Sequence, residues 1–83
     1  MVAKAKKFEL CWYESTVNGY VSTKVLKIKD GMAQVIVTGK MNKHFAKREL
    51  LFVPLFRLFP KYCVHITRLG RIVIELPWVW EEE

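Results

Sequence analysis

The chain has 83 residues, which leaves room for one small domain and excludes a multidomain enzyme. Hydrophobic residues make up 52% of the sequence and Gly and Pro are few, so a disordered or low-complexity chain is excluded as well. The formal net charge is +6. We therefore expect a single folded domain over residues 1–83, with a loosely held basic arm at 1–7 and an acidic tail at 81–83, whose body attracts polyanions.

Apolar and polar residues alternate with a period of two along most of the chain, which is typical of β-strands. The apolar series are Phe8, Leu10 and Trp12; Leu26 and Ile28; Ala33, Val35 and Val37; and Ile72, Ile74, Leu76, Trp78 and Trp80. The sequence therefore predicts an all-β fold. The dipeptide Asn18-Gly19 suggests a turn after the first series, but a two-residue loop there sets Leu10 opposite Lys27 and mixes the two faces. A bulge or a longer loop through residues 15–19 would again place apolar residues of the two strands opposite one another.

The dipeptide Asp30-Gly31 predicts a hairpin with a two-residue turn, because both residues tolerate positive φ angles. Such a turn sets Leu26 opposite Val35, with apolar residues together on one face. It also sets Ile28 opposite Ala33 on that face, while residues 27, 29, 32 and 34 point to the other. Turn chemistry and hydrophobic pattern thus predict the same hairpin.

Residues 40–61 allow two interpretations. Either Asn42 caps a short helix through residues 45–51 that ends before Pro54, or residues 48–53 form a strand. We prefer the strand. Further along, Gly70 marks another predicted hairpin, with a three-residue loop over residues 69–71. That loop pairs Ile66 with Ile74, Val64 with Leu76, Tyr62 with Trp78, and His65 with Glu75.

Short strands separated by turns on fewer than 90 residues favour a small barrel, because closure removes exposed sheet edges. The strand over residues 20–29, Asp30-Gly31, the strand over 32–38 and the run Arg48-Glu49-Leu50-Leu51-Phe52-Val53-Pro54 resemble the SH3-like group of KOW, Tudor and chromo-type modules. We therefore expect a five-stranded, twisted antiparallel barrel, SH3-like or OB-like, with room for one short helix. The long hydrophobic hairpin at 62–80 departs from the simplest member of that group.

Two cysteines are too few for the disulfide framework of a small secreted domain, and the amino terminus lacks the apolar core of a signal peptide. The most apolar stretch, residues 50–59, contains Pro54 and Arg57 and has half the roughly 20 residues that a membrane-spanning helix needs. The sequence therefore predicts a cytoplasmic protein with free thiols and no membrane span.

No catalytic or cofactor motif stands out. Cys63 and His65 share a strand face, but a solvent-facing pair of His65 with Glu75 explains the histidine more simply than an activated thiolate does. The residues of zinc-binding type are Cys11, His44, Cys63 and His65. They lack the close C-x₂₋₄-C pairs that zinc sites use. We therefore expect neither an enzyme nor a metal or cofactor site.

Eight cations lie between residues 40 and 71 against one acid, Glu49. They are Lys40, Lys43, Lys47, Arg48, Arg57, Lys61, Arg68 and Arg71. Aromatic residues are interleaved with them, and single-stranded nucleic acid is held by cations for its phosphates and aromatic faces for its bases. Tyr13, Tyr20 and Phe45 are the candidates for stacking. The first hypothesis is thus non-enzymatic binding of single-stranded DNA or RNA, and the alternative is a basic surface that only keeps the domain soluble.

Residues 50–59 are almost continuously apolar, without the alternation that would point half of them inward. Exposed apolar patches on small domains mark protein partners or homodimer contacts. The candidate contact residues are Phe56, Phe59, Trp78 and Trp80. The second hypothesis is therefore a protein-binding adaptor or inhibitor. A third, an aromatic cage for methylated lysine, requires three exposed aromatic residues to cluster.

Overall fold

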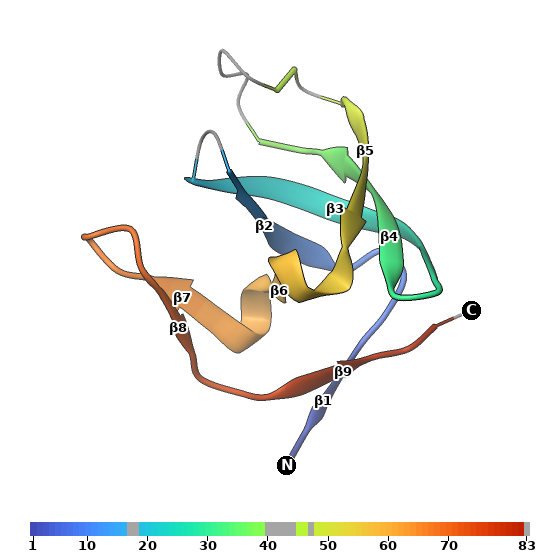
Figure 1. Ribbon diagram of the computed structural model, residues 1–83. Coiled ribbons are helices and arrows are strands. Elements are labelled where there is room, and N and C mark those ends of the chain that lie inside the picture. The colour runs from blue at the N-terminus through green and yellow to red at the C-terminus, as the bar shows by residue number, and fades with distance from the viewer. Residues whose placement is uncertain (17–18, 40–44, 47, 83) are drawn as a thin grey trace.

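The computed structural model describes residues 1–16, 19–39, 45–46 and 48–82. Its strands are β1 (Ala3–Ala5), β2 (Leu10–Ser15), β3 (Gly19–Lys29), β4 (Met32–Val37), β5 (Leu50–Pro54), β6 (Leu58–Pro60), β7 (Val64–Ile66), β8 (Ile72–Ile74) and β9 (Trp78–Trp80), with 3₁₀ helices η1 (Leu55–Arg57) and η2 (Lys61–Cys63). Five strands form one antiparallel sheet in the order β5-β4-β3-β2-β6, and β1 with β9 and β7 with β8 form two small sheets (Figure 1). The all-β prediction is confirmed.

The predicted β3–β4 hairpin is confirmed around its turn. Asp30 and Gly31 have φ angles of 53° and 75°, and Ile28 pairs with Ala33 as expected. The predicted partner of Val35 is wrong, because the register shifts between Val25 and Lys27 and sets Val25 opposite Val35. This β-bulge at residue 26 places Val25 in the core, where it is fully buried, and leaves residue 26 partly exposed.

Strand β2 pairs with β3 through a longer loop, as predicted: Ser15 lies opposite Gly19. Its buried face differs from the expectation. The register sets Cys11 opposite Thr23, and both side chains are fully buried, whereas Leu10 is exposed. The Thr23 hydroxyl donates a hydrogen bond to the Cys11 carbonyl at 3.1 Å, which satisfies the buried polar atom. The apolar series that begins at Phe8 therefore faces outward.

The strand interpretation of residues 48–53 is confirmed, since Leu50–Pro54 form β5. No α-helix occurs in the described ranges, so the helix through 45–51 is wrong there; Asn42 lies outside them. After β5, η1 redirects the chain into β6, which pairs with β2 at the opposite edge of the sheet. Strands β5 and β6 are thus the two edges, and among the described residues no ladder closes them into a barrel.

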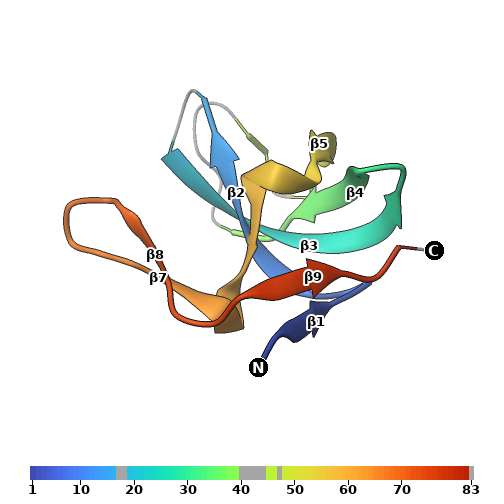
Figure 2. The same cartoon turned by 60° about the horizontal axis from the view of Figure 1, so that its bottom comes forward.

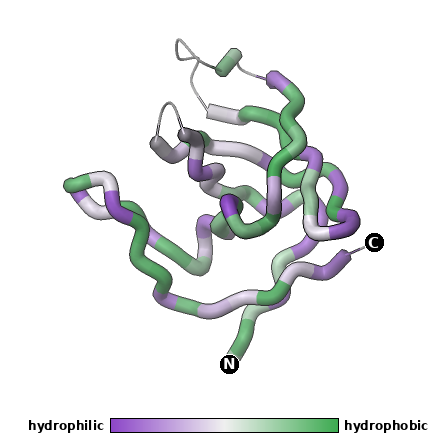
Figure 3. Tube along the Cα trace, viewed as in Figure 1, coloured by the Kyte–Doolittle hydropathy of each residue, from purple (hydrophilic) through white to green (hydrophobic). Residues whose placement is uncertain are grey.

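The carboxyl-terminal hairpin has a different register from the predicted one. Val64 pairs with Ile74 and Ile66 with Ile72. The Thr67 amide donates to the Arg71 carbonyl at 2.8 Å, so the three-residue loop spans 68–70 rather than 69–71. The hairpin projects from the rest of the molecule (Figures 1 and 2), although much of it is hydrophobic (Figure 3).

Residues near the amino terminus are held in the fold, and the prediction of a loose arm is wrong there. Strand β1 runs parallel to β9, with Ala3 opposite Trp78, and Ala5 is fully buried. The Glu81 amide donates to the Ala5 carbonyl at 2.7 Å and extends this pairing into the acidic tail.

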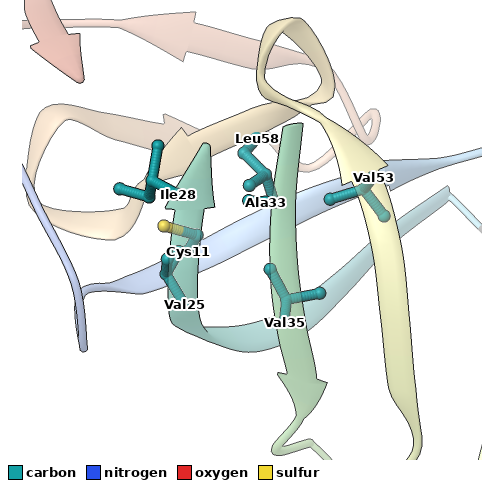
Figure 4. Packing of buried hydrophobic residues seen from close by; sticks show 7 residues of the cluster. All are labelled: Cys11, Val25, Ile28, Ala33, Val35, Val53 and Leu58. Atoms are coloured by element: carbon teal, nitrogen blue, oxygen red, sulfur yellow. The ribbon is translucent and has the colours of Figure 1, made fainter. Parts of the chain in front are cut away.

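The core lies between the curled strands of the large sheet (Figure 4). Its buried cluster comprises Cys11, Val25, Ile28, Ala33, Val35, Val53 and Leu58. Tyr13, Leu51, Leu55 and Trp80 pack against the cluster from its margins. In the part of the chain that the structure describes, no helix is long and apolar enough to cross a membrane.

Candidate nucleic-acid interface

The face of the large sheet that points away from the core is open to solvent. Directly paired residues share a face, and we call three neighbouring rows of pairs on this side, which reach from β3 to β5, the outer face. The rows are Leu10, Lys24, Ile36 and Leu50; Lys27, Gln34 and Phe52; and Lys29, Met32 and Pro54. These rows contain three lysines and no acid; an acid farther along the same side of the sheet, Glu14, pairs with Tyr20, and its carboxylate lies 3.9 Å from the Arg57 guanidinium.

Phe52 is the most prominent side chain of the outer face. It lies on edge strand β5 and is 74% exposed, although a phenyl ring is ordinarily buried in a domain of this size. Beside it is a shallow hollow of about 150 Å³ lined by Lys27, Lys29, Met32, Ala33, Gln34 and Phe52. The hollow therefore combines an aromatic face, two cations and one amide.

A second aromatic residue of the outer side is covered by a cation. Trp12 pairs with Ser22, and the Lys61 ammonium lies 4.2 Å from the centroid of the Trp12 ring. The same ammonium donates a hydrogen bond to the Ser22 hydroxyl. Lys61, a predicted phosphate ligand, thus lies over an aromatic ring at the β2–β6 margin.

Phe8 stands beside this surface in an unusual backbone conformation. Its φ angle is +72°, which costs free energy for a residue with a bulky side chain. Its amide donates to the Val25 carbonyl at 2.7 Å, and the ring is 58% exposed. The ammonium groups of Lys7 and Lys24 lie 5.4 and 5.7 Å from the ring centroid. The chain therefore holds an aromatic ring in solvent between two cations.

The predicted cations that the structure describes do not gather at one place. Arg48 is exposed just before β5, and Arg57 lies in η1, where its guanidinium is 3.4 Å from the Glu14 carbonyl and 3.9 Å from the Glu14 carboxylate. Arg68 and Arg71 are exposed at the tip of the β7–β8 hairpin. Lys40, Lys43 and Lys47 lie outside the described residues, so their assignment stays a prediction.

The predicted stacking residues are half-buried rather than exposed. Tyr13 meets Phe45 edge to face at 6.3 Å between ring centroids, and Tyr20 meets Phe59 in the same way at 6.2 Å. Phe59 also packs edge to face on Trp78 at 5.9 Å. The contacts of Tyr20 with Phe59 and of Phe59 with Trp78 join the carboxyl-terminal segment to the sheet. Of the predicted partner contacts, Trp80 packs on the core and Phe56 alone is prominent, at 76% exposed.

The cysteines are placed where a thiolate is unfavourable. Burial raises the pKa of the Cys11 thiol to about 12 and also raises the pKa of Cys63. The predicted contact of His65 with Glu75 is confirmed at 3.2 Å between Nδ1 and Oε1, although the two residues are diagonal neighbours. Among the described residues, no three His, Cys, Asp or Glu side chains cluster as metal ligands; His44 lies outside them.

Sequence reasoning missed Phe8 and Phe52 and the lysines at 24, 27 and 29 as members of one surface. For the lysines, the sequence did contain the information: in β3 residues 27 and 29 alternate with the apolar Ile28, which predicts that they lie on the opposite face from it. Phe52 could not be assigned to that face, because doing so requires the β4–β5 register, which no turn motif fixes. No protein-family model, characterised protein or solved structure matches the chain. The function is therefore inferred from the residues of this surface.

Proposed function

We propose that this protein is a non-enzymatic nucleic-acid-binding domain that holds single-stranded DNA or RNA against the outer face. The observation that carries the proposal is the exposed Phe52 ring beside Lys27 and Lys29, on a surface whose three rows have no acid. A solvent-exposed phenyl ring gains free energy when a base stacks on it, and neighbouring ammonium groups attract the phosphates of the same strand.

Single strands suit this surface better than a duplex. The bases of a duplex are stacked inside the helix, so a ring on a sheet face cannot reach their planes. An unpaired strand can turn its bases toward Phe52 and Phe8 while its backbone follows Lys24, Lys27 and Lys29. The affinity therefore combines stacking, which is insensitive to salt, with phosphate contacts, which are not.

We also propose that the large sheet is an SH3-like barrel left open between β5 and β6. The support is the strand order: β5 leads through the short helix η1 into β6, which returns to pair with β2 at the far edge. Such a path curls the sheet around the buried cluster of Val35, Val53 and Leu58. The curl would keep the outer face convex and accessible.

The proposal is tested by fluorescence anisotropy of labelled single-stranded DNA, RNA and duplex DNA at several salt concentrations. We expect salt-steep binding to a single strand, with log K falling by about 0.7 per phosphate for each unit of log salt. The Lys27→Ala/Lys29→Ala variant should reduce this slope by about 1.4, because two phosphate contacts are lost.

The matched control is Arg68→Ala/Arg71→Ala, which removes the same charge from the projecting hairpin. It should leave the slope unchanged. An equal fall in both variants would mean that net charge rather than the outer face attracts the strand. Flat curves with all three polymers would overturn the proposal and leave the exposed Phe56, beside the Arg57 guanidinium at 5.6 Å, as the basis of a protein-binding function.

A further inference from the structure

The hollow beside Phe52 contains an amide side chain, that of Gln34, in addition to its two lysines. Binding of the phosphate backbone alone would need only the lysines. Gln34 lies in the middle of its row, opposite Lys27 on one side and Phe52 on the other. Its side-chain amide makes no hydrogen bond within the part of the chain that the structure describes, and it is partly exposed. An amide offers a donor group and an acceptor next to each other, which is the pattern that base edges present.

We propose that this hollow is a subsite for one unstacked nucleobase, and that Gln34 gives it a preference among the bases. This inference rests on the proposed function. The base would lie on the Phe52 ring, its edge would meet the Gln34 amide, and its flanking phosphates would reach Lys27 and Lys29.

Three features of the hollow favour a base over other occupants. Its volume of about 150 Å³ admits a single planar ring system. Phe52 supplies an exposed aromatic surface, which a phosphate alone cannot use. The two lysines make the surroundings positive, so a base carried by an anionic backbone is favoured over an uncharged aromatic compound.

The test compares Phe52→Leu with Phe56→Leu. Both phenylalanines are about equally exposed, at 74% and 76%, and only Phe52 lines the hollow. With a short single-stranded oligonucleotide, Phe52→Leu should weaken binding about 5-fold to 150-fold, the range for loss of one stacked base. Phe56→Leu should bind like the wild type. Thermal unfolding by circular dichroism checks that both variants remain folded.

Two further measurements separate a base subsite from general attraction. An oligonucleotide of abasic sites with the same number of phosphates should bind the wild type at least as weakly as the intact oligonucleotide binds Phe52→Leu, because it has no base for the Phe52 ring or for the Phe8 ring. Gln34→Leu should retain salt-dependent binding while the ratios of affinity among the four homopolymers move toward one.

Equal binding of the abasic and intact oligonucleotides would overturn the inference, as would equal affinities of Phe52→Leu and Phe56→Leu. Homopolymer ratios unchanged by Gln34→Leu would remove the base preference. These results differ from failure of the proposed function, in which the wild type binds no oligonucleotide at all.

Discussion

Phe8 shows how a single residue can be kept in a conformation that its own chemistry opposes. Its left-handed backbone comes from the tight turn in which the Glu9 amide donates to the Lys6 carbonyl at 3.1 Å. A side chain with a Cβ loses about 1–2 kcal/mol in that region. The turn keeps the ring in solvent between Lys7 and Lys24 instead of in the core. We interpret this strain as the cost of presenting an aromatic ring at the outer face.

The strain at Phe8 predicts an unusual order of stabilities. Phe8→Gly should be more stable than Phe8→Ala by about 1 kcal/mol, because both remove the ring and only glycine accepts φ +72° without strain. Urea unfolding of the two variants measures the difference. Equal stabilities, or a more stable Phe8→Ala, would mean that residue 8 is not left-handed in solution. Both variants should lose the same oligonucleotide affinity.

Because the Cys11 thiol is buried, we expect the protein to lose stability in alkaline solution. The unfolded thiol ionises near its ordinary pKa of 9.0, whereas burial raises the pKa of the folded thiol to about 12. Between these values the unfolded state binds fewer protons than the folded state, so the free energy of unfolding falls as the pH rises. The contribution approaches about 1.4 kcal/mol per pH unit.

Urea unfolding at pH 8, 9 and 10 checks this expectation. Cys11→Ala should show a smaller decrease between pH 9 and 10 than the wild type, whatever its stability at pH 8. An identical decrease would show that the Cys11 thiol ionises freely in the folded protein. The range stops at pH 10 because burial also raises the pKa of Tyr20 and Tyr62, whose ionisation adds to the effect above that pH.

At the scale of elements, local chemistry determined what the sequence could predict. The Asp30-Gly31 turn fixes its own register, so the pairing of Ile28 with Ala33 followed from the chain. The bulge at residue 26 did not, because it depends on how β3 bends around the core. Strand β5 was recognised from its apolar run, but not the face on which Phe52 lies.

The errors at the carboxyl end have a related cause. The apolar residues of 62–80 match one another in more than one register: a three-residue loop over 69–71 pairs Ile66 with Ile74, and one over 68–70 pairs Ile66 with Ile72. The observed register instead frees Trp78 to contact Phe59 and places Tyr62 in η2, where its hydroxyl donates to the Lys4 carbonyl at 3.1 Å. Contacts with distant strands outweighed local pairing, which sequence patterns do not report.

At the scale of the whole molecule, the acidic tail reaches the basic surface. The Glu82 carboxylate accepts a hydrogen bond from the Gly31 amide at 2.8 Å, at the turn next to Met32 and Lys29 of the outer face. A negative charge at this end of the rows opposes the approach of phosphates. Its removal should therefore tighten the binding of a polyanion.

Glu82→Gln keeps the hydrogen-bond acceptor and removes the charge. We expect about twofold tighter binding of single-stranded oligonucleotides at low salt, from a screened repulsion of about 0.5 kcal/mol across roughly 8 Å of water. The difference should vanish at high salt. Glu75→Gln, on the projecting hairpin, is the control and should change affinity little. Equal gains in both variants would assign the effect to net charge rather than to the place of Glu82.

The parallel pairing of β1 with β9 has a consequence for how the protein is made. Ala3 lies opposite Trp78 and Ala5 opposite Trp80. Strand β1 therefore cannot form its pairing until β9, which is translated more than 70 residues later, has been synthesised. The β3–β4 hairpin can form while the chain is still being synthesised, since its partners are adjacent. The β1–β9 pairing closes a very long loop, so its loop-closure entropy cost is larger than that of the β3–β4 hairpin. On the ribosome, the cluster that Trp80 covers therefore stays open until the carboxyl-terminal segment has emerged.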